Sequence, residues 1–167
     1  ILFRYLASVN TPVVWVQHDC WAFTGGCMYF DMLECNLWKN SCGKCPENRA
    51  LFLNKSSYQF ALKKELISKI RNLTFVPVSN WLAGLLSQSY LGERPIKVIH
   101  NGTDISVFKP HEKAHHGPFR ILGVAADWIQ RKGLLEFYKL RKLLDQRFSI
   151  TLVGLTKKQI KHLHDGI

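Results

Sequence analysis

The residue types with the clearest capacity for chemistry are the five cysteines, which all lie between positions 20 and 45 of the 167-residue chain. Cys42 and Cys45 form a C-x-x-C knuckle, a spacing that suits tetrahedral coordination of a metal by thiolates. Cys27 and Cys35 could supply the two remaining ligands, although their separation is not that of a standard second knuckle. The pattern therefore predicts a structural zinc ion held by these four side chains.

Two other roles for the cysteines stay open. A disulfide bond could tie this region together, although an odd cysteine count without a secretion signal disfavours a disulfide framework. The thiols could also pack as small, buried apolar side chains. A catalytic thiol is not expected, because the sequence suggests no general base as its partner.

The second group of interest is cationic. Arg131 and Lys132 lie in the segment 127–133, between a predicted strand at 119–125 and a predicted helix at 133–145. Free N–H groups of the first helical turn, the helix dipole and two cationic side chains converge there, which is typical of a phosphate or diphosphate site. An exposed Arg-Lys pair on a turn is the alternative.

Two further pairs of residues follow predicted strands. His18 and Asp19 come directly after a strand at 12–17, and Asn101-Gly102 is predicted to form a tight turn after another strand. Loops at the carboxyl ends of parallel strands are where ligands bind in open α/β sheets. A histidine at a strand end is nevertheless more often structural than catalytic.

The elements that must position these residues alternate between strands and helices, separated early on by a long aperiodic loop from 20 to about 54. Ser56 or Ser57, Ser79 and Thr156 are the expected helix N-caps. Strands joined by a helix should be parallel, with a right-handed crossover. The predicted strands span 12–17, 73–78, 96–99, 119–125 and 148–153, and the predicted helices span 56–71, 81–91 and 133–145, with a last one after 156.

The helix at 56–71 is expected to bury one face. Its apolar residues recur with helical spacing, and we expect the buried stripe to consist of Leu62, Leu66 and Ile70, widened by Phe60 and Ile67.

Domain organisation follows from one polar stretch. Residues 109–118 contain two prolines and a glycine but no apolar residue larger than alanine, which predicts a linker. Residues 1–108 and 119–167 are then parts of two doubly wound, Rossmann-like α/β domains. A domain of this type needs on the order of 150 residues, so the chain is expected to be part of a longer protein.

Charge and hydropathy exclude several classes of protein. With 23 Lys and Arg against 12 Asp and Glu, the net charge of +11 favours anionic partners, although the scattered basic residues could also form a solvated face. The composition is that of a folded protein, and no N-terminal signal peptide is evident. Apolar runs such as 150–155 are far shorter than the roughly 20 residues that span a bilayer, which excludes a transmembrane protein.

Taken together, six segments resemble the retaining family-4 glycosyltransferases of GT-B fold, in particular the bacterial enzymes of polysaccharide synthesis. The resemblance covers nearly all of the chain, and the ordered set is more specific than any one motif. In chain order the segments are PVVWVQHD, WAFTGGC, CGKCP, PVSNWL, IHNGTD followed by FKP, and LGVAADWIQRKG.

The resemblance implies an acceptor-side domain, a nucleotide-sugar-binding domain and transfer of a sugar from a nucleoside diphosphate to a glycan or lipid-linked acceptor. It implies no catalytic metal or other cofactor, no nucleic-acid partner, and a cytoplasmic location, peripheral at the inner face of the membrane. It assigns His18 and Asp19 to the catalytic side of the cleft and donor contacts to Arg131, Lys132, Asn101 and Gly102.

Some features depart from the family pattern. A glycine-rich loop near the N-terminus and a later E-x₇-E segment are absent, and Gly123-Val124 stands where the family has Gly-Arg. We therefore expect the isolated chain to be inactive and one donor-phosphate contact to be missing. An alternative from another class is a nucleic-acid-binding module stabilised by metal at the cysteine cluster, based on the charge of +11.

Overall fold

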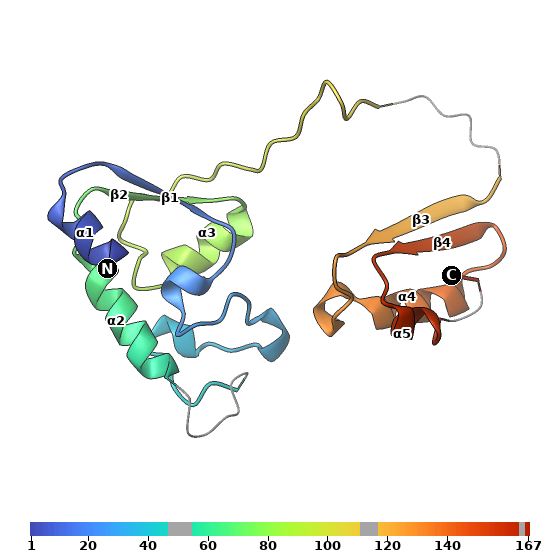
Figure 1. The fold of residues 1–167 in the computed structure, drawn as a ribbon, viewed down its shortest axis with the longest axis horizontal. Helices are drawn as coiled ribbons and strands as arrows, with labels where there is room; N and C mark the ends of the chain where they lie inside the picture. Colours follow the sequence, from blue (N-terminus) through green and yellow to red (C-terminus); the bar gives the residue numbers. More distant parts are fainter. Residues whose placement is uncertain (47–54, 111–116, 164–165) are drawn as a thin grey trace. The chain divides into compact units, whose positions relative to one another are not determined.

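The computed structural model describes residues 1–46, 55–110, 117–163 and 166–167 of the chain. It divides into two compact units, unit 1 (Ile1–Asp104) and unit 2 (Ile105–Ile167). Each unit contains a small parallel sheet with helices on one side of it (Figure 1). The molecule is therefore mixed α/β and compatible with parts of Rossmann-like domains.

The sheet of unit 1 pairs β1 (Val13–Gln17) with β2 (Leu73–Pro77) in parallel. The predicted strand at 96–99 is an extended segment beside β2, joined to it by one parallel bridge between Phe75 and Ile96. The Ile99 N–H donates to the Pro77 carbonyl oxygen at 3.2 Å, which carries the pairing to the carboxyl end of β2. The parallel arrangement predicted for these strands is confirmed.

Three helices cover one side of this sheet: α1 (Leu2–Ser8), α2 (Ser56–Ser68) and α3 (Asn80–Ser87) (Figure 1). The sequence analysis did not anticipate α1. Between the helices and the strands lies a core of fully buried side chains that includes Phe23, Trp38, Ile67, Phe75 and Leu86.

The expected N-cap of α2 was wrong, and its expected buried face is confirmed only in part. Lys55 holds the N-cap position without a side-chain cap, because the helix already begins at Ser56 and both predicted serine caps lie inside its first turn. The buried face consists of Phe60, Lys63 and Ile67, followed by Ile70 just beyond the helix, whereas Leu62 and Leu66 are only half-buried. The apolar stripe is therefore rotated so that it includes a lysine.

The predicted cap of α3 is confirmed. The Ser79 hydroxyl oxygen accepts a hydrogen bond from the Leu82 N–H at 3.2 Å. The helix ends at Ser87, earlier than predicted, because the backbone then turns and the Ser89 hydroxyl donates to the Leu86 carbonyl oxygen.

In unit 2, β3 (Phe119–Val124) pairs in parallel with β4 (Phe148–Val153), and α4 (Leu134–Leu143) connects the two strands. A short helix, α5 (Lys157–Ile160), follows β4. Thr156 caps it through a capping box with Gln159, which confirms the predicted N-cap. The strand-helix-strand order of this unit agrees with the sequence.

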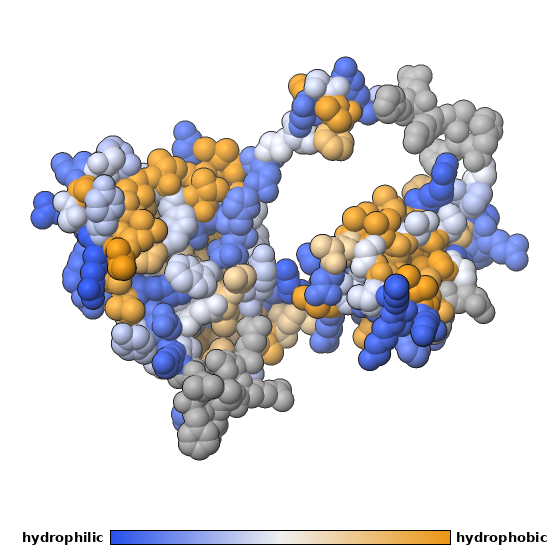
Figure 2. Space-filling model, viewed as in Figure 1, coloured by the Kyte–Doolittle hydropathy of each residue, from blue (hydrophilic) through white to orange (hydrophobic). Residues whose placement is uncertain are grey.

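Each sheet has one open face. Val14 and Val16 on β1, and Leu122 and Val124 on β3, are at least half exposed, and apolar surface is visible on both units (Figure 2). Parallel sheets are usually covered on both faces, so these valines and leucines are surface that a complete doubly wound domain would bury.

The predicted linker at 109–118 falls within unit 2, and its residues 111–116 lie outside the described residues. The domain limits at 108 and 119 stay a prediction. Within the described ranges, no helix is both long enough and apolar enough to cross a membrane.

Candidate functional site

The first candidate site is the carboxyl edge of the unit 1 strands. His18 is exposed and comes directly after β1. The last residue of β1, Gln17, is bonded to the segment after β2, because its carbonyl oxygen accepts the Val78 N–H at 3.2 Å. On the other side of β2, His100 Nδ1 lies 3.0 Å from the Val78 carbonyl oxygen, and Asn101 follows. The structure thus brings His18 and the Asn101 segment to one edge of the same sheet.

The other predicted residues of this edge differ in character. Asp19 is half-buried, and its Oδ1 accepts the Trp21 N–H at 2.8 Å, so its carboxylate fixes the start of the loop that follows. Asn101 and Gly102 are exposed, and neither has a positive φ. The predicted tight turn is wrong, because the segment paired with β2 continues without turning.

The second candidate site lies in unit 2, where Arg131 and Lys132 belong to a short 3₁₀ helix, Gln130–Lys132. Gly133, with a φ of 75°, ends this helix and serves as the N-cap of α4. Such a left-handed conformation suits glycine, and without a side chain Gly133 leaves the first turn of α4 with no side-chain cap. The two cations therefore flank a helix N-terminus, as the sequence predicted.

Charge at this site is not purely positive. Glu136 lies in the first turn of α4, but its carboxylate is paired with Lys139 at 2.9 Å. The Lys132 side chain is exposed and the Arg131 side chain is half-buried. Both residues are close to the start of α4 because they directly precede its N-cap in the chain. The arrangement can attract an anion.

Trp128 holds this segment in place, and the sequence analysis did not single it out. Its indole N–H donates to the Val153 carbonyl oxygen at 2.9 Å, and its ring packs edge-on against Phe137 with centroids 5.5 Å apart. Its own carbonyl oxygen accepts from Gln159 Nε2 at 3.0 Å. A single tryptophan among polar loop residues was the available signal for such an anchor.

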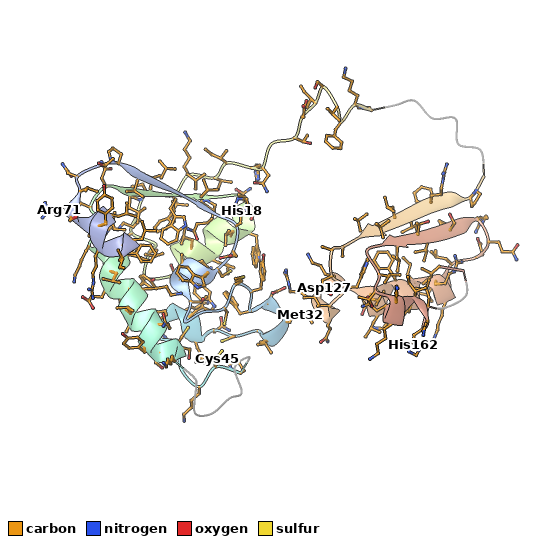
Figure 3. The ribbon with its side chains drawn as sticks, in the orientation of Figure 1. His18, Met32, Cys45, Arg71, Asp127 and His162 are labelled. Carbon is orange, nitrogen blue, oxygen red and sulfur yellow. The ribbon has the colours of Figure 1, made fainter. Side chains whose placement is uncertain are left out.

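The cysteine loop is a third feature, separate from the carboxyl edge of unit 1: Cys45 lies near the start of α2, whereas His18 lies at the end of β1 (Figure 3). Cys27 Sγ and Cys45 Sγ are 4.0 Å apart, and Cys42 Sγ accepts the Gly25 N–H at 3.0 Å. The structure shows the cysteines without a disulfide bond. In the described part of the chain, no three His, Cys, Asp or Glu side chains converge closely enough to hold a metal as they stand.

The cysteines differ in their electrostatic surroundings. Burial, followed by the charges of Asp19 and Asp31, raises the pKa of Cys20 to about 12. Burial also raises the pKa of Cys42, opposed by the Gly25 N–H and assisted by the nearby charges of Cys35 and Cys45. Cys42 therefore interacts with two other cysteines of the predicted set, and Cys20 is set apart as a buried thiol.

Lys63 is a buried charged residue that was not predicted from the sequence. Only 4% of it is exposed, its ammonium group donates to the Trp21 carbonyl oxygen at 2.5 Å, and it lies 4.0 Å from the Trp21 ring centroid. Burial lowers its pKa to about 8, opposed by the negative charges of Cys42, Cys27 and Asp19. The sequence holds one sign of this burial: Lys63 lies three residues after Phe60 and four before Ile67, so it falls on the same face of α2 as these apolar residues.

Comparisons with known proteins find one distant relative among the curated proteins. No family model matches the chain, and no solved structure matches it significantly. Among curated proteins, the chain is similar to the "Putative colanic acid biosynthesis glycosyl transferase WcaC" of Escherichia coli (strain K12), with 29% identity over 102 residues. The match covers 58% of this chain and 24% of that protein, so the chain spans about a quarter of its length. The chain is thus distantly similar to a protein named as a glycosyltransferase of polysaccharide synthesis.

Proposed function

We propose that the chain is part of a retaining glycosyltransferase of family 4 with a GT-B fold, acting in bacterial surface polysaccharide synthesis. The observation that carries the proposal is the placement of Arg131 and Lys132 beside the N-terminus of α4, in the connection that leads from the parallel strand β3 to this helix. This is the place where open α/β sheets bind phosphate groups. The distant similarity to the colanic acid protein supports the same conclusion.

The proposed reaction transfers a sugar from a nucleoside diphosphate sugar to a hydroxyl group with retention of configuration. Cleavage of the bond between sugar and phosphate leaves negative charge on the diphosphate. Arg131, Lys132 and the N–H groups of the first turn of α4 stabilise that charge, because they are already oriented before the bond breaks. Such a reaction needs no metal or other cofactor from the protein.

The carboxyl edge of unit 1 supplies the acceptor side. His18 is exposed there and faces the reacting sugar in this proposal. Asn101 and Gly102, at the same edge, contribute donor contacts through their backbone and amide groups, whereas Asp19 orders the loop behind His18 through its bond to the Trp21 N–H. The acceptor is a glycan or a lipid-linked glycan, and the charge of +11 favours a protein that works in the cytoplasm beside anionic lipids.

Calorimetric titration with UDP, GDP and their sugar conjugates tests the donor site. We expect saturable binding to the wild type and a loss of at least about tenfold in affinity for the Arg131→Ala/Lys132→Ala variant, because each charged contact is worth about 1.5–3 kcal/mol. A matched control is Lys142→Ala/Lys158→Ala, which removes the same charge from exposed positions elsewhere in unit 2.

Three outcomes would count against the proposal: no binding of any nucleotide, equal loss in both double variants, or preferential binding of a single-stranded oligonucleotide. Equal loss would assign the binding to net charge alone. Oligonucleotide binding would instead favour a nucleic-acid-binding module.

A further inference from the structure

The cysteine loop and Lys63 carry an inference that is independent of sugar transfer. We propose that Cys27, Cys35, Cys42 and Cys45 bind one zinc ion as thiolates, and that the buried Lys63 ammonium compensates the charge of this site. The ion would tie residues 20–46 onto α2.

The geometry begins with a sulfur pair. Cys27 Sγ and Cys45 Sγ are 4.0 Å apart, although their residues are 18 positions apart in the chain. Two thiolates bound to one zinc at about 2.3 Å lie about 3.8 Å apart in a tetrahedral site, whereas a disulfide requires about 2.05 Å. The observed separation is thus close to one edge of a zinc tetrahedron.

Cys42 lies beside this pair. Its sulfur accepts the Gly25 N–H at 3.0 Å, and a Cβ atom at Gly25 would lie only 2.7 Å from the Cys42 Cβ. The lack of a side chain at Gly25 therefore lets the backbone approach the sulfur, and an N–H donor favours the thiolate form. Cys35 is the remaining half-buried cysteine of the same loop.

The four sulfurs do not yet converge in the structure, where the cysteines are thiols. Binding requires Cys35 and Cys42 to turn toward the Cys27–Cys45 pair, and each of the four thiols releases its proton as a sulfur–zinc bond forms. All four side chains are half-buried, which leaves room for rotation and access for the ion. Cys20 is fully buried and takes no part.

The charge of Lys63 favours zinc over a disulfide or free thiols. Four thiolates and one Zn²⁺ carry a net charge of −2, and such a site inside a protein needs a nearby cation. Lys63 is 4% exposed, and its ammonium group donates to the carbonyl oxygen of Trp21, in the same loop as the cysteines. The Lys63 ammonium would balance part of the negative charge of the zinc site, whereas a disulfide or neutral thiols carry no charge for it to balance.

The loop itself needs such a tie. Between β1 and α2 its described part has only three short 3₁₀ helices, each of three residues, although Trp38 packs into the core between Phe23 and Phe30. A structural zinc would fix the part of the loop that contains the C-x-x-C knuckle, of which Cys42 packs against the edge of the core.

Metal analysis of the purified chain, without added metal, gives the first test, and Co²⁺ replacement gives the second. We expect one zinc ion per chain, and after replacement the absorption of a tetrahedral cobalt site with four sulfur ligands. Both readouts use the wild type, so they do not depend on whether a variant folds. No zinc together with five titratable thiols, or a mass lower by two hydrogens from a disulfide, would overturn the proposal.

Variants then identify the ligands. Cys42→Ser and Cys45→Ser should lose the zinc, whereas Cys20→Ser, the internal control, should retain it. Lys63→Met should weaken Zn²⁺ affinity roughly 10- to 100-fold in a competition with a chelating dye, the range for residues just outside a metal's ligands. Lys64→Met, an exposed neighbour on α2, should have the wild-type affinity. Zinc content that is unchanged by Cys→Ser substitution would show adventitious binding and overturn the proposal.

Discussion

The ammonium group of Lys63 lies 4.0 Å from the centre of the Trp21 ring and donates to the carbonyl oxygen of the same residue. One lysine of α2 thereby holds both the backbone and the side chain of a loop residue 42 positions earlier. Tyr90 binds the next residue in the same way, because its hydroxyl donates to the Ala22 carbonyl oxygen at 2.7 Å. The start of the cysteine loop is therefore attached to unit 1 at two adjacent carbonyl groups.

We expect Trp21→Leu to lower the free energy of unfolding of unit 1 by about 0.5–2 kcal/mol, the range for a cation over an aromatic ring. The substitution keeps the carbonyl group that Lys63 binds, so it isolates the ring interaction. Trp81→Leu is the control, because Trp81 is exposed on α3 and should change stability by less than about 0.5 kcal/mol. Urea denaturation followed by far-ultraviolet circular dichroism would measure both, and equal effects would contradict the role of the ring.

Cys20 should be the slowest cysteine to react with iodoacetamide at pH 9. Its pKa is raised from 9.0 to about 12, so at pH 9 it stays a thiol, whereas an unfolded cysteine would be about half thiolate. The same shift means that Cys20 stabilises the fold below pH 9 and that this contribution is lost as the pH rises toward 12. Mass spectrometry of timed samples, with a chelator present, would measure the rates.

Denaturation provides the control for Cys20. In urea its rate should rise to that of the other cysteines, because burial is the largest cause of the raised pKa. If Cys20 reacted as fast as Cys35 in the native protein, the buried position of Cys20 would be wrong.

Much of the fold could be predicted from local sequence patterns. The strands at Val13–Gln17 and Phe148–Val153, the Ser79 cap and the capping box at Thr156 all depend on residues close together in the chain. The α1 helix was not predicted, because its seven residues contact α2 rather than carry a signal of their own. The turn at Asn101-Gly102 was wrong for the opposite reason: the two residues carry a local turn signal, but the extended segment that pairs with β2 up to Ile99 continues through them without a turn.

The residues of a candidate site could be predicted only where they belong to a motif that is visible in the sequence. Arg131 and Lys132 follow from their position between a strand and a helix, which is visible in the sequence. Lys63 does not, because its role depends on Trp21 and the cysteines, which reach it through tertiary packing. A charged residue on an apolar helical face can show that something polar lies opposite, but it cannot show what.

Ser79→Ala should destabilise unit 1 by about 1 kcal/mol, because the Leu82 N–H loses the hydroxyl oxygen that accepts its hydrogen bond. The control is Ser87→Ala at the other end of α3, where the hydroxyl only donates to the Gly84 carbonyl oxygen. Hydrogen exchange of the α3 amides would measure both variants. Equal protection in Ser79→Ala and the wild type would show that the cap does not contribute.

His18→Ala should lower the rate of nucleoside diphosphate release from the sugar donor by about 10²-fold or more, if His18 faces the reacting sugar as proposed. The affinity for the free nucleoside diphosphate should stay within about twofold, because the proposed phosphate contacts lie in unit 2. His162→Ala removes an exposed histidine of unit 2 and should leave the rate unchanged. The assay uses the longest form of the protein that releases nucleoside diphosphate, and an unchanged rate in His18→Ala would remove His18 from the reaction.

Trp128→Phe should destabilise unit 2 by about 1–2 kcal/mol and weaken nucleoside diphosphate binding at the same time. The phenyl ring can still pack on Phe137, but the hydrogen bond from the indole N–H to the Val153 carbonyl oxygen is lost. The cost is limited because that oxygen also accepts the Ala125 N–H at 3.2 Å, so it keeps one partner.

The coupling between stability and binding is the informative part of the Trp128 experiment. The indole fixes the segment that leads into the 3₁₀ helix of Arg131 and Lys132, so loosening it should disorder both cations without changing the charge of the protein. Hydrogen exchange of β4 and calorimetric titration with UDP and GDP would be measured on the same sample, with Trp81→Phe as the control. Lower protection with unchanged affinity would mean that Trp128 supports the sheet alone and that the cations bind anions from a segment positioned by other contacts.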